Sequence, residues 1–371
     1  MSVEVNPSPE SSQSDSSVTR TTKKERFAVL DGMRGVAALF IVTIHTGALW
    51  HFDFPRGYLA VDLFFVLSGF VIAHSYDARL ASSLSASEFI KIRLIRLMPF
   101  VYLSVPISIA HYITLHHEPK YIALVVLSGI SSLFLVPSYV PGTDFIFPIN
   151  PPIWSLFYEV IVNTVYAFIR PKLTRRTLIA IVATAWIMMC FFCIRSGKDE
   201  SGHSWNVISF LTGLSRSMFG IFLGIGLYHI RSRFDWIGKV KFAPWLAILL
   251  LPFLLGSQDF GWFNPYADLL IVVVFFPALV IMGAQRAHET SSYKWLLVLG
   301  SISYPLYLLH VSSGRLFEKL TDHIHVPFPW IRGIVFLALM IPLCLWLEKA
   351  YDIPVRKRLS KRFLVKVPDT K

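Results

Sequence analysis

Eleven apolar runs divide the sequence, and they constrain the fold more than any other feature of the chain. They cover residues 28–50, 57–76, 97–115, 121–136, 153–169, 177–194, 207–230, 242–255, 267–284, 295–317 and 331–349. A helix that crosses a bilayer needs about 20 mostly apolar residues. Charged residues make up only 16% of the 371 positions, against about 25% in soluble domains. The sequence therefore predicts an all-α membrane protein.

The two ends of the chain differ from this apolar region. Residues 1–26 are polar and rich in serine, a composition typical of disordered segments. Residues 351–371 are strongly basic. We expect a disordered tail over 1–26, a transmembrane domain over 27–350 and a basic tail over 351–371. The run 28–50 is too long for the apolar core of a signal peptide, so we expect it to be a retained first span.

Basic clusters give the spans an orientation. They lie at 23–26, 91–96, 170–176, 231–241 and 356–371, and cytoplasmic loops collect Lys and Arg. If all clusters are cytoplasmic, an even number of crossings separates neighbouring clusters. Three apolar runs lie between Arg96 and Arg170, and the run 121–136, which contains several serines, is the weakest. We therefore expect a bundle of about ten transmembrane helices plus one re-entrant or interfacial helix.

This topology places both termini in the cytoplasm and the chain in the cell (inner) membrane. The alternative is an eleven-span protein with an external C-terminus, which would leave the basic C-terminal residues on the wrong side. Orientation also accounts for the net charge of +12, so we exclude nucleic acid as a partner. Membrane lipid is the expected surrounding.

Three ionisable residues lie in the first span, where charge is unfavourable and usually functional. They are Asp31, Arg34 and His45. Arg34 and His45 are 11 positions apart, which is about 20° past three helical turns and a rise of about 16.5 Å. We expect all three on one stripe, with Asp31 and Arg34 near the cytoplasm and His45 toward the outside. The alternative for Asp31 and Arg34 is a structural ion pair.

A second basic pair stands at Arg93 and Arg96. The spacing of three residues places both guanidinium groups on one helical face, and arginine binds phosphate through a charge-assisted fork. With Arg34 they form an expected inner cationic group. The alternative is that they only anchor the chain at the cytoplasmic surface.

Further ionisable residues are expected in the outer half of the membrane. Asp62, Glu159 and His310 join His45 in a group with acid–base capacity, and Arg216 is buried in another span. Glu159, Arg216 and His310 could instead be satisfied polar contacts between helices. Together with the inner arginines, such a group would suit a phosphate-bearing donor inside and a hydroxyl acceptor outside.

These motifs resemble the membrane acyltransferase-3 family in its stand-alone form, and six of them occur in the family's order. They are Leu30 to Gly35 followed by His45; Phe64, Phe65, Ser68, Gly69 and Phe70; Arg93, Arg96 and Pro99; Trp154, Ser155, Leu156 and Glu159; Ser303, Tyr304, Tyr307, Leu308 and His310; and Glu348, Lys349 and Pro354. The resemblance runs from about residue 29 to residue 358.

The resemblance implies a multi-span enzyme that transfers an acyl group, most commonly acetyl in this family, from cytoplasmic acyl-CoA to a hydroxyl. The acceptor would be a cell-surface polysaccharide, a lipopolysaccharide, a related glycan or a small hydroxylated molecule. His45 would be either the general base or a transient acyl carrier, and Arg34, Arg93 and Arg96 would bind the CoA phosphates. The resemblance also implies catalytic roles for Asp31, Arg34 and Glu159. It implies substrate contacts for a larger set of residues: Asp62, Trp154, Ser155, Arg216, Ser303, Tyr304 and His310.

No bound cofactor and no metal is expected, and polysaccharide assembly proteins are possible partners. Two other function classes remain open from the residues. A transporter or flippase could use the same buried charges to move a lipid-linked sugar or an anion. A structural partner of a polysaccharide export system would tolerate neutralisation of those charges.

Overall fold

Helices make up almost all of the described chain. The computed structural model describes residues 27–364, apart from 53, 116, 198–201, 241, 286–292, 325–327 and 329. Within these residues there is no β-sheet, and the bridge between Phe145 and Ser204 is isolated. The all-α prediction is confirmed. The expected tail at 1–26 and the last residues of the basic tail, 365–371, lie outside the described residues.

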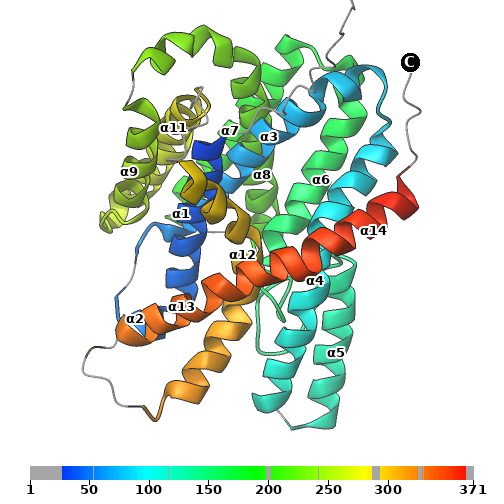
Figure 1. Cartoon of the computed structure of the whole chain (residues 1–371), viewed down its shortest axis with the longest axis vertical. Coiled ribbons are helices and arrows are strands. Elements are labelled where there is room, and N and C mark those ends of the chain that lie inside the picture. Colours follow the sequence, from blue (N-terminus) through cyan, green and yellow to red (C-terminus); the bar gives the residue numbers. More distant parts are fainter. Residues whose placement is uncertain are drawn as a thin grey trace, which may run out of the picture.

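The helical elements run in chain order from α1 to α14 (Figure 1). They are α1 (Ala28–His45), α2 (Gly47–Trp50), η1 (Gly57–Leu59), α3 (Ala60–Ser82), α4 (Ala86–Leu115), α5 (Pro119–Leu133), α6 (Ile153–Ile169), η2 (Arg170–Lys172), α7 (Arg175–Ser196), α8 (Val207–Ile230), η3 (Arg231–Lys239), α9 (Ala243–Leu255), η4 (Gly261–Phe263), α10 (Asn264–Leu270), η5 (Ile271–Phe275), α11 (Phe276–Gly283), α12 (Lys294–Thr321), α13 (Trp330–Leu347), η7 (Glu348–Asp352) and α14 (Ile353–Phe363).

All eleven apolar runs lie mainly in helices. Among the described residues, eight helical segments are long and apolar enough to cross a bilayer. Helices α5 and α9 are shorter apolar helices, and α6 has 17 residues. The chain is therefore a protein with several candidate spans, and the count of about ten crossings stays a prediction. Helix α14 continues from α13 through η7, so the expected basic tail begins as a helix.

The run 121–136, the weakest span predicted from the sequence, packs mainly through small residues. Helix α5 packs on α4, and its buried residues are Val125, Ser128, Gly129 and Ser132. A Cβ atom at Gly129 would overlap the side chain of Ile109 on α4. Small residues let two apolar helices approach closely, so Gly129 allows the α4–α5 contact, while Ser128 shares a hydrogen bond with Ser138 in the following loop.

Two close helix pairs form the centre of the molecule, α1 with α12 and α3 with α8. Glycines allow both approaches. Gly35 on α1 lies against Leu299 on α12, and Gly300 on α12 lies against Asp31. Gly69 on α3 lies against the backbone of Ile221 on α8. These contacts hold α1 to α12 and α3 to α8, and α1 also packs on α3. The helices α1, α3 and α12 carry most of the site described below.

Replacing Gly69 by Ala should destabilise the fold. A Cβ atom there would overlap the carbonyl group of Ile221, which is backbone and cannot rotate away. Overpacking of this kind costs about 1–3 kcal/mol, so we expect a lower melting temperature in detergent. Gly47→Ala is the matched control, because a Cβ atom at Gly47 meets nothing within 4 Å. Equal melting temperatures for the two variants would contradict the close α3–α8 contact.

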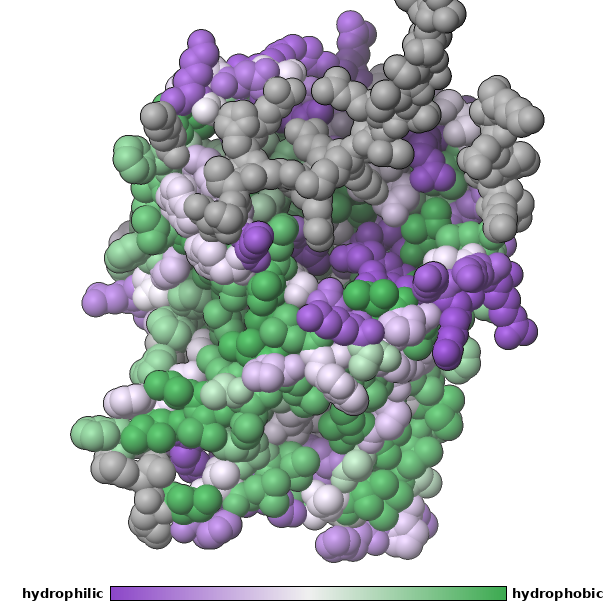
Figure 2. Space-filling model, in the orientation of Figure 1, coloured by the Kyte–Doolittle hydropathy of each residue, from purple (hydrophilic) through white to green (hydrophobic). Residues whose placement is uncertain are grey.

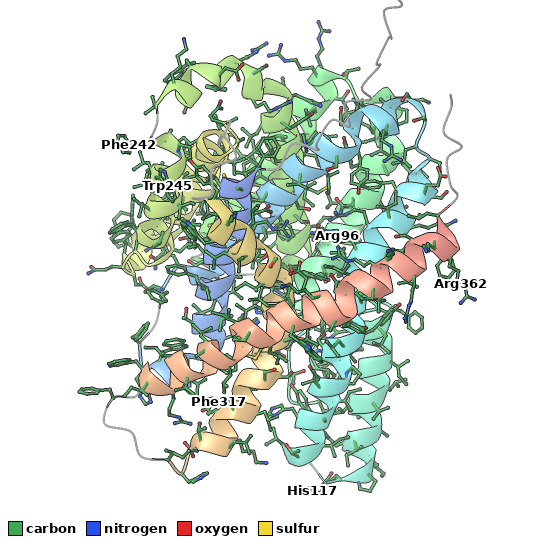
Figure 3. The ribbon with its side chains drawn as sticks, in the orientation of Figure 1. Arg96, His117, Phe242, Trp245, Phe317 and Arg362 are labelled. Atoms are coloured by element: carbon green, nitrogen blue, oxygen red, sulfur yellow. The ribbon has the colours of Figure 1, made fainter. Side chains whose placement is uncertain are left out.

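Three connections gather at one end of the molecule, and two of them, at residues 170–176 and in η3, are basic. Figure 1 shows the α3–α4 and α6–α7 connections and η3 toward the top, whereas the α4–α5 connection lies at the bottom, near His117 in Figure 3. Figure 2 shows hydrophilic residues at the top and along α14, and a largely hydrophobic surface below. The clusters at 170–176 and in η3 thus lie at one end, whereas the cluster on α14 lies at mid-height in Figure 1. The orientation of the termini stays a prediction.

Candidate active site

Two cavities lie in the helix bundle. The first, here called the arginine cavity, has a volume of about 360 Å³ and is walled by α1, α3, α4, α6 and α12. Its polar lining residues are Asp31, Arg34, Ser68, His74, Ser75, Tyr76, Arg93, Arg96, Ser155, Glu159, Ser303, Tyr304 and Tyr307. The three arginines predicted to form a cationic group are therefore brought together. Figure 3 labels Arg96, which lies above the C-terminal helix α14 in that view.

The second cavity, here called the histidine cavity, has a volume of about 150 Å³. Its polar and aromatic lining residues are His45, Tyr58, Phe145, Trp154, His203, Arg216 and Tyr307. His45 is the last residue of α1, and its side chain is exposed. Helix α1 thus carries Arg34 to one cavity and His45 to the other, as the predicted direction of the first span requires.

The two cavities share a wall. Val61 on α3 and Tyr307 on α12 line both of them. The Tyr307 hydroxyl shares a hydrogen bond of 2.7 Å with Ser155 Oγ and donates to the carbonyl oxygen of Pro152 at 3.2 Å. The two cavities are therefore adjacent at this wall.

Glu159 lines a different cavity from the one expected. The sequence placed it level with His45, but it lines the arginine cavity. Its Oε1 atom accepts hydrogen bonds from Ser68 Oγ at 2.6 Å and Arg93 Nη2 at 2.5 Å. The carboxylate therefore holds Arg93 in place. Its assignment to the outer acid–base group is wrong, because helix α6 faces α3 and α4 at this level.

The predicted position of Asp62 also needs correction. It lines neither cavity and instead forms a two-pronged ion pair with Arg216, with distances of 3.0 Å and 2.7 Å. Both side chains are only 1% exposed. The Arg216 guanidinium lies over the ring of Trp154 at 5.4 Å. Asp62 thus orients Arg216, and it is Arg216 and Trp154 that line the histidine cavity.

The ring of His310 lies next to the ring of His45 and is the more deeply buried of the two. The centroids of the two rings are 5.2 Å apart, and His310 is completely buried. Its Nδ1 atom is 3.1 Å from the carbonyl oxygen of Leu306, so Nδ1 carries the proton in that hydrogen bond. Its Nε2 atom has no hydrogen-bond partner among the described residues. A neutral acceptor nitrogen therefore lies close to His45, in support of a positioning role for His310.

The remaining predicted residues lie in the arginine cavity. Asp31 lines it beside Arg34. Ser303 donates to the carbonyl oxygen of Gly300 at 2.7 Å, and Tyr304 donates to the carbonyl oxygen of Leu97 at 2.5 Å. These two hydroxyl groups mainly hold α12 to itself and to α4. Ser155 also lines this cavity, and it connects to Tyr307 as described above.

Sequence reasoning gave no site role to Tyr58 or Tyr307 of the histidine cavity, and it also missed two loop residues, Phe145 and His203. They come from two loops that meet through the isolated bridge, where Ile146 N–H donates to the carbonyl oxygen of His203 at 2.8 Å. Their rings are 5.2 Å apart, and His203 also lies 6.2 Å from the ring of Trp154. No periodicity marks such loop residues. Only the aromatic and proline content of residues 137–152 could have drawn attention to Phe145, and no such signal surrounds His203.

Comparisons with known proteins point to one family. The family model described as "Acyltransferase domain" matches residues 27–349. The chain is 36% identical over 180 residues to "Protein 2 in picA locus" of Rhizobium radiobacter, covering 44% of this chain and 93% of that protein. It is 26% identical to O-acetyltransferase OatA of Staphylococcus aureus, covering 90% of this chain and 58% of that protein. No solved structure matches the chain.

A further relative is the peptidoglycan O-acetyltransferase OatA of Listeria monocytogenes, which is 25% identical over 91% of this chain and 57% of that protein. The chain thus spans less than two thirds of the length of both OatA relatives. The matched part includes all residues of the two cavities.

Proposed function

The chain belongs to the acyltransferase-3 family, as its motifs indicated, and from that premise we propose that it is an integral membrane O-acetyltransferase. The donor is acyl-CoA held in the arginine cavity, and the acceptor is a hydroxyl group in the histidine cavity. One observation carries this proposal: the two cavities meet at a wall made by Val61 and Tyr307. Groups held in the two cavities would therefore lie on either side of the same two side chains.

The arginine cavity has the charge for a phosphate-bearing donor. Arg93 is fixed by Glu159, while Arg34 and Arg96 face the same space. Three guanidinium groups around one cavity repel one another unless an anion lies between them, and the phosphates of CoA are such anions. The thioester end would then extend toward Tyr307. The donor would enter from the cytoplasm, since this cavity lies nearer the basic end.

His45 supplies the chemistry in the histidine cavity. In the direct route the acceptor oxygen attacks the thioester carbon, a C–O bond forms and the C–S bond breaks. His45 takes the hydroxyl proton and returns it to the leaving thiolate, so the products are the ester and free CoA. In the covalent route a ring nitrogen of His45 first attacks the thioester carbon, the C–S bond breaks and CoA leaves as the thiolate. The acceptor hydroxyl then attacks the acyl carbon, the N–C bond breaks as the ester forms, and the hydroxyl proton neutralises the thiolate. His310 supports either route, because it can accept a hydrogen bond from His45 and orient the ring.

The acceptor is proposed to be a hydroxyl of a cell-surface glycan. The OatA relatives are named for O-acetyl transfer, and the Listeria protein for peptidoglycan. The histidine cavity supports this class, since the rings of Phe145, Trp154 and His203 offer apolar faces beside the polar groups of His45 and Arg216. Apolar walls with a few placed polar groups are typical of ligand sites.

The direct test is to incubate purified protein in liposomes with acetyl-CoA and a glycan, and to measure the mass of the glycan. We expect a mass increase of one acetyl group with release of free CoA. Surface glycans from cells with and without the protein should show the same difference, and the increment separates acetyl from succinyl. Movement of glycan without any acylated product would instead favour a transporter or flippase.

Arg96→Ala should weaken donor binding. Its side chain is exposed in the arginine cavity and takes part in no ion pair among the described residues, so its loss removes a phosphate contact without stranding a carboxylate. A hydrogen bond to a charged group contributes about 1.5–3 kcal/mol, so the Kd for acetyl-CoA should rise about tenfold or more. Titration calorimetry measures it.

Lys91→Ala is the control for this measurement. Lys91 is an exposed residue on the same helix, α4, and does not line the arginine cavity. Its replacement removes the same charge at a place where no donor contact is expected. Equal Kd values for Arg96→Ala, Lys91→Ala and the unchanged protein would exclude Arg96 from the donor site.

A further inference from the structure

The hydroxyl group of Tyr307 stands where the two cavities meet. Of the two residues in the shared wall, Val61 is apolar, so Tyr307 supplies the wall's only side-chain polar group within the described residues. Tyr307 is 5% exposed. An acyl group that leaves a donor in the arginine cavity and joins an acceptor in the histidine cavity must have its carbonyl at this wall.

The ring of Tyr307 is clamped. Phe64 meets it edge to face with centroids 5.6 Å apart, and the ring of His310 lies at 6.2 Å. The Tyr307 hydroxyl, Ser155 Oγ and the carbonyl oxygen of Pro152 form a triangle of hydrogen bonds. The Tyr307 oxygen lies 2.7 Å from Ser155 Oγ, and each of these two hydroxyl groups lies 3.2 Å from the Pro152 oxygen. The oxygen is thus fixed in space, while its proton can turn from Pro152 to another acceptor.

The local field at this wall favours a negative charge. Pro152 is the residue before α6, and Ser155 lies in the first turn of that 17-residue helix. Helix N-termini carry a partial positive charge and stabilise anions. An oxyanion that forms beside Ser155 and Tyr307 would therefore be stabilised by the helix end as well as by the hydroxyl group.

We propose that the Tyr307 hydroxyl donates a hydrogen bond to the carbonyl oxygen of the acyl group during transfer, with Ser155 as its positioning residue. When a nucleophile attacks the carbonyl carbon, one electron pair of the C=O bond moves onto oxygen. Tyr307 stabilises that oxyanion, and the pair returns when the C–S bond breaks and the thiolate leaves. The nucleophile is the acceptor hydroxyl or His45, and the oxyanion is the same in both routes. This inference rests on the proposed acyl transfer.

Ser155 acts through Tyr307. When the Tyr307 hydroxyl donates its hydrogen bond to the oxyanion and no longer to Pro152, the Ser155 hydroxyl can donate a hydrogen bond to the Tyr307 oxygen. A donor that itself accepts a hydrogen bond is polarised and donates more strongly. Ser155 therefore holds the tyrosine oxygen and strengthens its donation without touching the substrate.

Tyr307→Phe tests the role of the hydroxyl, because it keeps the ring and the wall. Removing one oxyanion donor lowers kcat about 10²–10³-fold, and we expect a fall of this size in acetyl transfer with little change in KM for acetyl-CoA. Tyr112→Phe is the matched control. Tyr112 is buried, its hydroxyl also donates to a proline carbonyl, that of Pro148, at 2.8 Å, and it lines neither cavity. Melting temperatures in detergent should fall equally in both variants.

Ser155→Ala and the double variant with Tyr307→Phe separate the two roles. Ser155→Ala should lower kcat less than Tyr307→Phe does, and adding it to Tyr307→Phe should lower kcat no further, since its effect passes through the tyrosine oxygen. Independent, multiplying effects would overturn the positioning role of Ser155.

Two outcomes overturn the inference while the proposed function stands. One is an unchanged kcat in Tyr307→Phe. The other is a higher KM for acetyl-CoA with an unchanged kcat, which would make Tyr307 a contact of the bound donor and not of the oxyanion. If the unchanged protein transfers no acetyl group from acetyl-CoA, the proposed function itself fails and the inference fails with it.

Discussion

His45→Ala should abolish acyl transfer while the protein still folds and accumulates in the membrane. The side chain is exposed in the histidine cavity at the end of α1, so its removal leaves no cavity in the core, and exposed substitutions usually change stability little. The reaction, in contrast, loses its base or its acyl carrier. General base catalysis alone contributes about 10²–10⁴-fold, so we expect a fall of at least that size in acetyl transfer to the acceptor.

His117→Ala is the control for this experiment. His117 is an exposed histidine at the α4–α5 connection, at the opposite end from the basic connections (Figure 3), and it lines neither cavity. It should retain full activity. Full transfer by His45→Ala, measured as acetylated acceptor per amount of folded protein, would remove His45 from the mechanism.

The same purified protein also distinguishes the two possible roles of His45, general base and acyl carrier. If His45 carries the acyl group, the unchanged protein mixed with acetyl-CoA without acceptor should gain one acetyl group on the peptide that contains His45. If His45 is a base, no such peptide forms although transfer proceeds once the acceptor is added. Peptide mass spectrometry after rapid quenching reads the outcome.

Asp62→Ala should prevent accumulation of the folded protein. Arg216 would be left with its charge buried, because its side chain is 1% exposed and Asp62 holds it at two positions. Breaking a buried ion pair on one side costs about 3–5 kcal/mol, which is a large part of the stability of an ordinary domain. We expect a much lower melting temperature in detergent and a smaller amount of protein in the membrane.

The pair of Asp322 and Arg332 gives the matched control, because its carboxylate lies in solvent. Their closest distance is 3.8 Å and Asp322 is 81% exposed, so Asp322→Ala should change the melting temperature little. Replacing both buried partners, Asp62→Leu with Arg216→Met, should restore much of the stability, because no lone charge remains. A melting temperature for Asp62→Ala equal to that of the unchanged protein would show that the pair contributes nothing to the fold.

Much of the architecture follows from local patterns. An apolar run of about 20 residues in a chain with few charges has no soluble alternative, and every such run lies mainly in a helix. The spacing of Arg93 and Arg96 predicted a shared helical face, and both residues line one cavity. The family followed from six short motifs, and the family model confirms it.

Pairing between helices could not be predicted in the same way. The period of a helix says which face of that helix a residue occupies, but not which neighbour the face meets. Glu159 was expected level with His45, and yet it lies in the arginine cavity, where it accepts hydrogen bonds from Arg93 and Ser68. The charge pattern of the sequence orients a helix but does not fix which side chains of two helices meet.

The sequence by itself determined that this chain enters a membrane as helices, and that α1 carries an arginine and a histidine separated along its length. Only the tertiary structure decided that Asp62 pairs with Arg216, 154 positions away, and that Tyr307 and Val61 stand between the two cavities. The physical reason is the same in both cases. Local preferences act over one or two turns, whereas a buried charge or a shared wall exists only when helices from distant parts of the chain pack against each other.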